Sequence, residues 1–211
     1  MSDHYYTENP ASAHDEREVR VCALGNALTF TTDAGVFSRD GLDRGTQALL
    51  ETLPALSGRV LDLGCGWGAV GVALGKKYPA LEIVMTDINQ RAVDLARRNL
   101  ARNGVAAEVV QGDGFENVAG EFDAIITNPP IRAGKAVIYG LFARARDYLK
   151  PDGALYIVIR KQQGAPSALK FLKENYTEAG VIDRGSGFHV LRARMSPSEQ
   201  AQKSVKSNTE K

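Results

Sequence analysis

Cysteine and histidine are scarce in this sequence. The two cysteines, Cys22 and Cys65, and the three histidines form no spaced motif, so we expect neither a disulfide framework nor a metal site. Long apolar runs are also missing, and without them the chain has no predicted signal peptide or membrane span. Together these absences favour an unexported, cytoplasmic protein with no membrane partner.

A strong net charge is missing as well. Lys and Arg total 26 against 25 for Asp and Glu, a formal net charge of +1, so the overall composition does not indicate a nucleic-acid partner. The 211 residues, 44% of them hydrophobic, suit a single core. We therefore predict one folded domain over residues 17–195, between flexible polar tails at 1–16 and 196–211.

Short apolar runs alternate with helical periods over residues 58–195. Because strands and helices alternate, we expect an α/β core with a mostly parallel sheet, helices on both faces and an antiparallel hairpin within 181–195. Before it, residues 17–57 predict a β-hairpin and a helix over 40–53, an appendage able to cover a site. The predicted core strands are 59–63, 82–86, 107–111, 123–127 and 154–159, and the predicted core helices are 69–77, 89–102 and 135–149.

A glycine-rich turn follows the first core strand. Residues 60–68 read VLDLGCGWG, which lets the backbone approach a ligand where a buried strand turns into a helix. A tight structural turn and a dinucleotide site are the alternatives. The spacing differs from the dinucleotide fingerprint G-x-G-x-x-G, and Asp62 would repel a pyrophosphate but attract a cationic amino group. We therefore predict a different cofactor, held by Asp62, Gly64, Cys65 and Gly66.

Two further acids follow corresponding strands. Asp87 comes after the apolar run 83–85, and Asp113 comes after the strand 107–111. Since the carboxyl ends of parallel strands meet at one edge of a sheet, both acids should join Asp62 there. Asp87 can then accept hydrogen bonds from ribose hydroxyls, and Asp113 can accept one from an adenine amino group. Helix capping is the alternative role for each acid.

The strand 123–127 ends at the same edge, in the run Asn128-Pro129-Pro130-Ile131. Two consecutive prolines remove two backbone donors and restrict the chain, so the turn can hold acceptors in fixed positions. The side-chain oxygen of Asn128 and the carbonyl of Pro129 can each accept a hydrogen from a planar amino group, which exposes its nitrogen lone pair. A rigid structural turn is the alternative, and the upstream glycine loop favours catalysis.

These motifs stand in the order of a known class of enzymes. Asp62 to Gly66, Asp87, Gly112-Asp113 and Asn128 to Pro130 resemble the class I methyltransferase pattern. Within that class, the runs GVFSRDGLD and NPPIRAGK, at 35–43 and 128–135, resemble the RsmC-like guanine-N2 methyltransferases of small-subunit ribosomal RNA. The resemblance implies a Rossmann-like, seven-stranded sheet, S-adenosylmethionine in the glycine loop and methyl transfer to the exocyclic amine of a guanine. It adds Ile88, Gly114 and Asn128 to the residues expected at the cofactor.

Three residues are candidates for contacting the substrate. Residues 132–161 include seven basic and two acidic residues. Arg132 and Lys135 are the two basic residues nearest in sequence to the predicted catalytic turn. They can neutralise phosphates that flank a flipped base. Phe37 can cover the cofactor or the base, with a core position as its alternative. Many members of the family have an aromatic residue where Ile131 stands, and Ile131 offers apolar contact without π stacking.

Ribosomal RNA or the small ribosomal subunit is thus the predicted partner, and the predicted reaction is guanine-N2 methylation. Methylation of a protein glutamine amide or a small amine stays open, because the same turn recognises any planar nitrogen. A non-catalytic cofactor-binding module is the third alternative. Larger members carry an additional amino-terminal domain, for which 211 residues leave no room, so we expect recognition by this domain, its tails or a second subunit. The oligomeric state is left open.

Overall fold

The protein is described here by a computed structural model that covers residues 8, 10 and 12–196. Most of the predicted tails 1–16 and 196–211 lies outside the described residues. Within the part of the chain that is described, no helix has both the length and the apolar character needed to cross a lipid bilayer.

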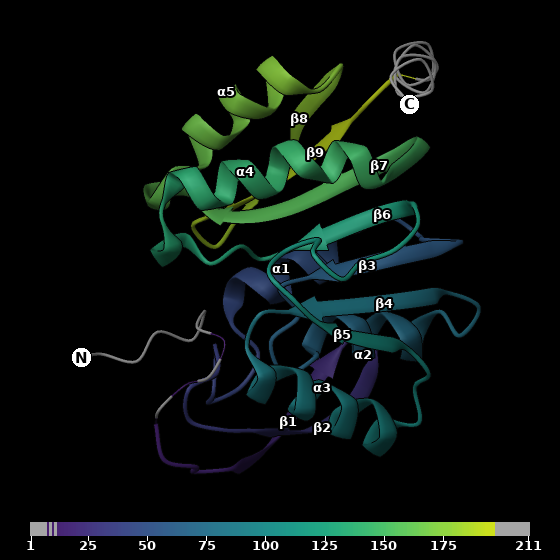
Figure 1. Ribbon diagram of the computed structural model, residues 1–211, viewed down its shortest axis with the longest axis vertical. Helices are drawn as coiled ribbons and strands as arrows, with labels where there is room; N and C mark the ends of the chain where they lie inside the picture. The colour runs from purple at the N-terminus through teal and green to yellow at the C-terminus, as the bar shows by residue number, and fades with distance from the viewer. Residues whose placement is uncertain (1–7, 9, 11, 197–211) are drawn as a thin grey trace.

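A mostly parallel seven-stranded sheet forms the centre of the molecule (Figure 1). Its strand order is β5-β4-β3-β6-β7-β9-β8. Neighbours from β5 to β7 run parallel, whereas β9 runs antiparallel to both β7 and β8. This arrangement confirms the predicted class I fold with its antiparallel C-terminal hairpin. The strands are β3 (Arg59–Leu63), β4 (Glu82–Asp87), β5 (Glu108–Gln111), β6 (Phe122–Thr127), β7 (Leu149–Arg160), β8 (Glu178–Gly185) and β9 (Phe188–Arg194).

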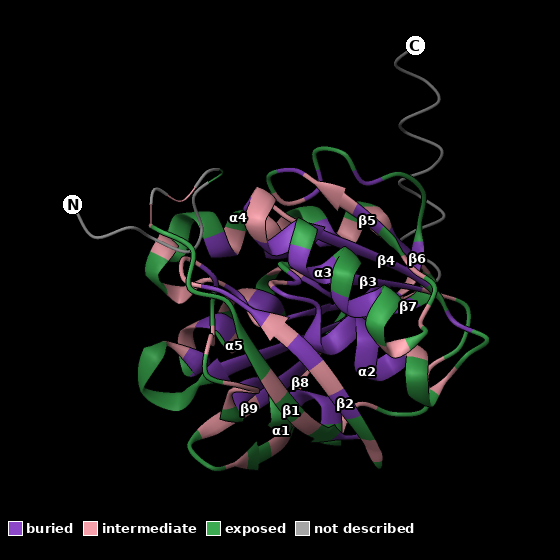
Figure 2. Ribbon diagram, turned by 90° about the horizontal axis from the view of Figure 1, so that it is seen from below, coloured by how far each residue is buried: buried purple, intermediate pink, exposed green. Residues whose placement is uncertain are grey.

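Helices cover both faces of this sheet, as predicted, and Figure 2 shows the buried strands between the two layers. On one face, Leu49 of α1, Val72 of α2 and Val93 of α3 share a core cluster with the sheet. On the other face, Phe142 of α4 and Leu172 of α5 belong to a second cluster. The helices are α1 (Arg44–Thr52), α2 (Ala69–Lys77), α3 (Gln90–Asn103), α4 (Lys135–Ala145) and α5 (Ala165–Asn175).

The predicted amino-terminal hairpin is present as the two-stranded sheet of β1 (Arg17–Ala23) and β2 (Asn26–Thr32). It is fixed to α3 by the buried side chain of Asn99, which accepts from the Thr31 N–H at 2.7 Å and donates to the Thr31 and Trp67 carbonyls at 2.9 and 2.8 Å. Because the hairpin packs on a helix, it does not cover a site itself. The segment that follows it, residues 36–46, reaches the cavity described below.

Part of the predicted first tail lies against α3 instead of extending from the domain. The Arg91 guanidinium donates to the carbonyl oxygens of Pro10 at 3.4 Å and Ser12 at 2.8 Å. The backbone N–H of Gln90 donates to the carbonyl of Glu8 at 3.0 Å. These bonds hold the described residues before β1 across the start of α3, an interaction that the polar composition of the segment did not indicate.

Two helical boundaries differ from the prediction, and one helix was not predicted. The helix expected over 40–53 begins only at Arg44, because Asp43 is extended and caps it. The helix expected over 135–149 ends at Ala145 and continues as a single 3₁₀ turn, Arg146–Tyr148. Helix α5 was missed, although Pro166 lies in its first turn, where proline is well tolerated.

Candidate active site

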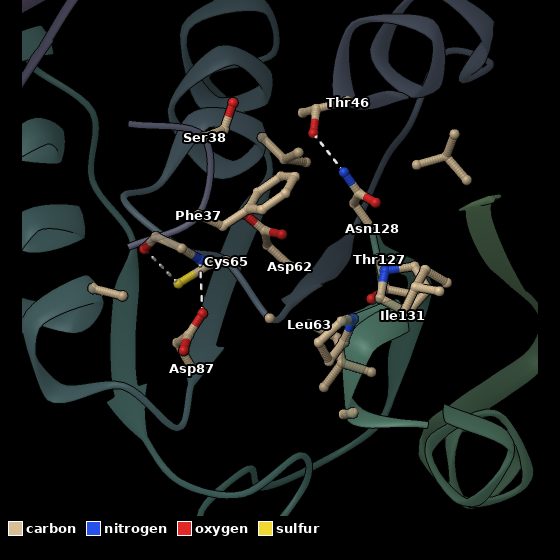
Figure 3. A pocket seen from close by; sticks show the side chains of 18 of the residues that line it. Phe37, Ser38, Thr46, Asp62, Leu63, Cys65, Asp87, Thr127, Asn128 and Ile131 are labelled. Atoms are coloured by element: carbon tan, nitrogen blue, oxygen red, sulfur yellow. Dashed lines mark hydrogen bonds between the residues drawn. The ribbon is translucent and has the colours of Figure 1, made fainter. Parts of the chain in front are cut away.

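A cavity of about 680 Å³ opens at the carboxyl edge of the parallel strands. The loops after β3, β4, β5 and β6 line it, together with residues 36–46 and the end of β7. This is the edge at which open α/β sheets bind ligands. Figure 3 shows the side chains of β3, β4 and β6 converging on the cavity, with Phe37 lying across it from the opposite side.

The glycine loop gives the cavity a backbone-lined wall. The N–H groups of Gly64 and Cys65 both donate to the Thr86 carbonyl at 2.9 Å, which ties the loop to the end of β4. Gly64 and Gly66 have φ values of +76° and +55°, a region that favours glycine, and a Cβ at either position would project into open space. The loop therefore forms a cradle that side chains would fill, which is the feature that a closely bound cofactor requires.

Two carboxyl groups lie beneath this cradle, Asp62 buried and Asp87 half-buried. Asp62 is 3% exposed, and this burial raises the pKa of Asp62 to about 7. The negative charge of Asp87 also raises this pKa, whereas the hydrogen bond that the Gly71 N–H donates at 3.0 Å lowers it. Burial also raises the pKa of Asp87, although the N–H groups of Asn89 and Gly66 donate to its carboxylate at 2.9 and 2.8 Å. Such a pair favours a cation between or beside the two acids.

Asp113 lies in a different environment. It is exposed and lines the cavity between Gly112 and Gly114. Its backbone N–H donates to the carboxylate of Glu116 at 3.3 Å, so the turn after β5 is locally braced. In the strand order β5-β4-β3-β6, Asp113 follows β5, Ile88 follows β4 and Asn128 follows β6, so Asp113 and Asn128 line the cavity from strands that two others separate. An elongated ligand with a polar group at one end fits this arrangement.

The Asn-Pro-Pro-Ile turn lies at the opposite end of the cavity. Pro129 is buried, and Asn128 is half-buried at the end of β6. The side-chain nitrogen of Asn128 donates to the Thr46 hydroxyl at 3.0 Å and to the Asp43 carboxylate at 3.3 Å. Figure 3 shows the amide nitrogen directed toward Thr46 and the amide oxygen directed away from it. The oxygen is thus the end left to accept a hydrogen bond from a ligand.

The structure brings almost all of the predicted site residues to this one cavity. Lys135 is the exception, because it stands exposed at the start of α4, beyond the short 3₁₀ turn Ile131–Ala133, and does not line the cavity. Its contact with RNA phosphates stays a prediction. The predicted residues that line the cavity are Phe37, Asp62, Gly64, Cys65, Gly66, Asp87, Ile88, Asp113, Gly114, Asn128, Pro129, Pro130, Ile131 and Arg132.

Several lining residues were not predicted. Asp43 and Thr46 contact Asn128 although some eighty residues separate them along the chain. The sequence signal for Asp43 was its place at the end of the run 35–43, which carried the family resemblance but did not indicate Asn128 as a partner. Arg160 and Phe188 also line the cavity, and the Arg160 guanidinium lies 5.8 Å from the centre of the Phe188 ring. No local motif marks this pair.

Comparison with known proteins places the chain in a family. Residues 27–192 match the family model of the methyltransferase small domain. The chain belongs to this family. Membership confirms, at the level of the family, the prediction of an S-adenosylmethionine-dependent methyltransferase.

Curated relatives of this family member differ in length. YbxB, a Bacillus subtilis protein described as uncharacterized, is 39% identical over 199 residues, which cover 92% of this chain and 99% of YbxB. Ribosomal RNA small subunit methyltransferase C of Aeromonas hydrophila is 42% identical over 182 residues, 82% of this chain but 52% of that enzyme. The chain therefore spans about half the length of the relatives that carry this enzyme name.

Among solved structures, the T. thermophilus 16S rRNA N2 G1207 methyltransferase (RsmC), in complex with AdoMet and guanosine, has a TM-score of 0.77 to this chain. The two are 27% identical, and the match covers 88% of this chain and 52% of that one. The two proteins thus share a fold over most of the length of the family member described here.

Proposed function

We propose that this chain transfers a methyl group from S-adenosylmethionine to the exocyclic N2 amine of a guanine in small-subunit ribosomal RNA. The observation that carries the proposal is the orientation of Asn128, whose amide nitrogen is bound by Thr46 and Asp43 so that its oxygen is the end available to a ligand. An oxygen fixed at that position recognises an N–H donor, and an exocyclic amine is such a donor.

The residues present fit the proposed cofactor. Asp62, which is buried and forms no ion pair within the described part of the chain, would hold the amino group of the methionine part, while Gly64 and Gly66 let the backbone approach it. Asp87 would accept from the ribose hydroxyls, and Asp113 from the adenine amine at the far end of the cavity. When bound, the cofactor supplies an electrophilic methyl group on a sulfonium sulfur.

The protein's own contribution to the reaction is mainly positioning. A conjugated exocyclic amine is weakly nucleophilic, so holding it in line with the donor methyl is most of the task. The Asn128 oxygen would accept one amine hydrogen and direct the nitrogen lone pair toward the cofactor end of the cavity. Phe37, 39% exposed and lying across the cavity, would exclude water above the reacting atoms. The amine proton would leave to water after transfer.

Guanine in ribosomal RNA is favoured over other amines by the relatives. The matched curated enzymes are named ribosomal RNA small subunit methyltransferase C, and the matched solved enzyme holds guanosine. Ile131 packs against the second core cluster, so we assign the cover of the base to Phe37. Arg132, exposed at the rim, would contact a flanking phosphate.

The test is transfer of label from radioactive S-adenosylmethionine to RNA and to small subunits purified from a strain that lacks this protein, followed by nucleoside analysis. Label in N2-methylguanosine is the expected result. Another labelled nucleoside would overturn the base assignment. Label that stays in protein after nuclease digestion would overturn RNA as the acceptor and favour a glutamine amide.

A further inference from the structure

Asn128 has two partners at the start of α1, Asp43 and Thr46, and the proposed reaction assigns no separate role to either of them. We propose that Asp43 is a positioning residue whose carboxylate, with the Thr46 hydroxyl, fixes which end of the Asn128 amide faces the methyl acceptor. The proposal deepens the proposed function and rests on it, because it assumes that the Asn128 oxygen binds the acceptor nitrogen.

The carboxylate of Asp43 makes contacts in two directions. Its Oδ1 accepts the backbone N–H groups of Gly45 at 2.9 Å and Thr46 at 3.3 Å, which caps α1. Its Oδ2 accepts the Thr46 hydroxyl and lies 3.3 Å from Nδ2 of Asn128. The same Nδ2 donates to the Thr46 oxygen at 3.0 Å. The amide thus meets two acceptors on α1.

This set of contacts permits only one orientation of the amide. An ionised carboxylate can only accept hydrogen bonds, and the Thr46 hydroxyl has given its hydrogen to that carboxylate, so both groups present lone pairs to Asn128. A reversed amide would place its oxygen against these lone pairs and its NH₂ against the amine of the substrate. The charge of Asp43 also polarises the amide and strengthens the oxygen as an acceptor.

The start of α1 is held in place from the other side. A Cβ at Gly45 would lie 2.9 Å from the ring of Phe188, so the absence of a side chain lets the helix start approach β9 closely. Leu49 and Leu50, both at most 2% exposed, anchor the same helix in the core. The carboxylate that faces Asn128 therefore belongs to a rigid element and not to a loose loop.

Asp43→Asn separates capping from positioning. Asparagine caps a helix about as well as aspartate does, so the oxygen of the new side chain can keep the contacts to Gly45 and Thr46. Its NH₂ then replaces Oδ2 and opposes the NH₂ of Asn128. We expect a fall in kcat of about 100-fold, the effect of a misplaced reacting group. The KM for RNA, the Kd for S-adenosylhomocysteine and the melting temperature should stay near the wild-type values.

Two substitutions of Thr46, of which one keeps the hydroxyl and the other removes it, test the same proposal a second time. Thr46→Ser keeps the hydroxyl and should retain wild-type turnover, whereas Thr46→Val keeps the volume, loses the acceptor and should resemble Asp43→Asn. A readout independent of activity is the side-chain amide signal of Asn128 in a ¹⁵N–¹H spectrum, assigned by its loss in Asn128→Asp. It should shift in Asp43→Asn and Thr46→Val and stay in place in Thr46→Ser.

The outcomes separate this proposal from the proposed function. If the wild-type enzyme methylates a nitrogen other than guanine N2, the proposed function fails, and the same variants are then assayed on that acceptor. If guanine N2 is methylated and Asp43→Asn turns over as fast as the wild type, only the role of Asp43 is overturned. Parallel losses of melting temperature, cofactor affinity and kcat in both Asp43→Asn and Thr46→Val would make the role structural and overturn it too.

Discussion

At the scale of single residues, we assign Asn128 to the methyl acceptor and Asp62 to the cofactor. Asn128 lies at the end of the cavity proposed for the methyl acceptor. Among the described residues, its side chain donates hydrogen bonds to Asp43 and Thr46 and to no residue of the glycine loop. Asp62 lies under the loop and has the Gly71 N–H as its hydrogen-bond donor. Substitutions at the two positions should therefore affect different steps.

Replacing Asn128 by Ala should remove transfer while leaving the cofactor bound. The change deletes the acceptor oxygen at the end of the cavity far from Asp113, so we expect kcat to fall about 100-fold or more. Isothermal titration with S-adenosylhomocysteine should give a Kd within about threefold of the wild-type value, a difference of less than 1 kcal/mol. Turnover at the wild-type rate would remove Asn128 from the proposed mechanism.

Replacing Asp62 by Asn should stabilise the ligand-free protein at high pH. The pKa of Asp62 is raised to about 7 in the folded state from a usual value of 3.8, so between these values the folded protein holds a proton that the unfolded chain has lost. Stability therefore falls as pH rises through this window. Asn keeps the acceptor for Gly71 without the charge, which should add on the order of 1–4 kcal/mol at pH 8 and little at pH 4.

Melting curves of the two proteins across this pH range check the expectation, since each kcal/mol moves the midpoint by about 2–4 °C in a protein of this size. The same variant should bind S-adenosylmethionine much more weakly at pH 8, because the partner of the amino group is gone. A variant that is no more stable than the wild type at pH 8 would contradict the raised pKa.

At the scale of elements, side chains of α3 hold the hairpin of β1 and β2, and Asn99 is the fully buried one among them. Asn99, fully buried, is bonded to two backbone groups of Thr31 and to the Trp67 carbonyl. Asn99→Ala leaves these groups without partners, and we expect a loss of about 2–4 kcal/mol in the free energy of unfolding. Asn175, whose amide bonds only to a carbonyl of its own helix, is the matched control.

Urea denaturation of Asn99→Ala and Asn175→Ala measures the difference, and the control should lose less than about 1 kcal/mol. Hydrogen exchange at Thr31 of β2 should accelerate only in the Asn99 variant, because the Asn99 side chain accepts from the Thr31 N–H, whereas the Asn175 amide bonds to a carbonyl of its own helix. Equal losses in the two variants would show that Asn99 does not hold the hairpin.

The boundaries of the strands show how much of the fold could be predicted from the sequence alone. Strands followed by glycine, acid or proline signals, such as β3, β4 and β6, were predicted within a residue or so, because buried apolar runs and turn residues act locally. The early start of β7 at Leu149 was missed because Pro151, Asp152 and Gly153 are typical of a turn, and the pairing with β6 shifts register there. A register shift is set by the neighbouring strand, not by the local sequence.

The residues of the candidate site also fall into a group that local sequence patterns could predict and a group that they could not. Each residue that was predicted to bind the cofactor lies at the end of its own strand or shortly after it, so the parallel sheet alone brings the set together. Asp43, Thr46, Arg160 and Phe188 reach the cavity through the packing of α1 and the pairing of β9, which depend on contacts across most of the chain. Local patterns could not indicate them.

At the scale of the whole molecule, the near-neutral charge limits how the proposed RNA substrate can be bound. With a formal net charge of +1, contacts with phosphates must come from local groups such as Arg132 and Arg160 at the cavity. We expect the logarithm of the affinity for RNA to fall with the logarithm of salt concentration with a slope of only about −2 to −4, which corresponds to few phosphates.

Fluorescence anisotropy with a labelled RNA fragment between 50 and 200 mM salt, about the range over which such slopes are resolved, gives this value. The double change Arg132→Ala and Arg160→Ala should reduce the slope by about 1–2 without altering the Kd for S-adenosylhomocysteine. Arg20→Ala, on the exposed side of the hairpin, serves as the control. If the double substitution leaves the salt dependence of the RNA affinity unchanged, Arg132 and Arg160 do not contact the RNA phosphates.

The close approach of Gly45 to Phe188 joins the first quarter of the chain to the last strand that the structure describes. β9 is made after β8, yet it is inserted between β7 and β8. During synthesis, the strands β3, β4, β5 and β6, which carry the glycine loop, its acids and Asn128, emerge from the ribosome before β9 does. We therefore expect the end of the cavity proposed for the methyl donor to form before the start of α1 takes its final place beside Asn128.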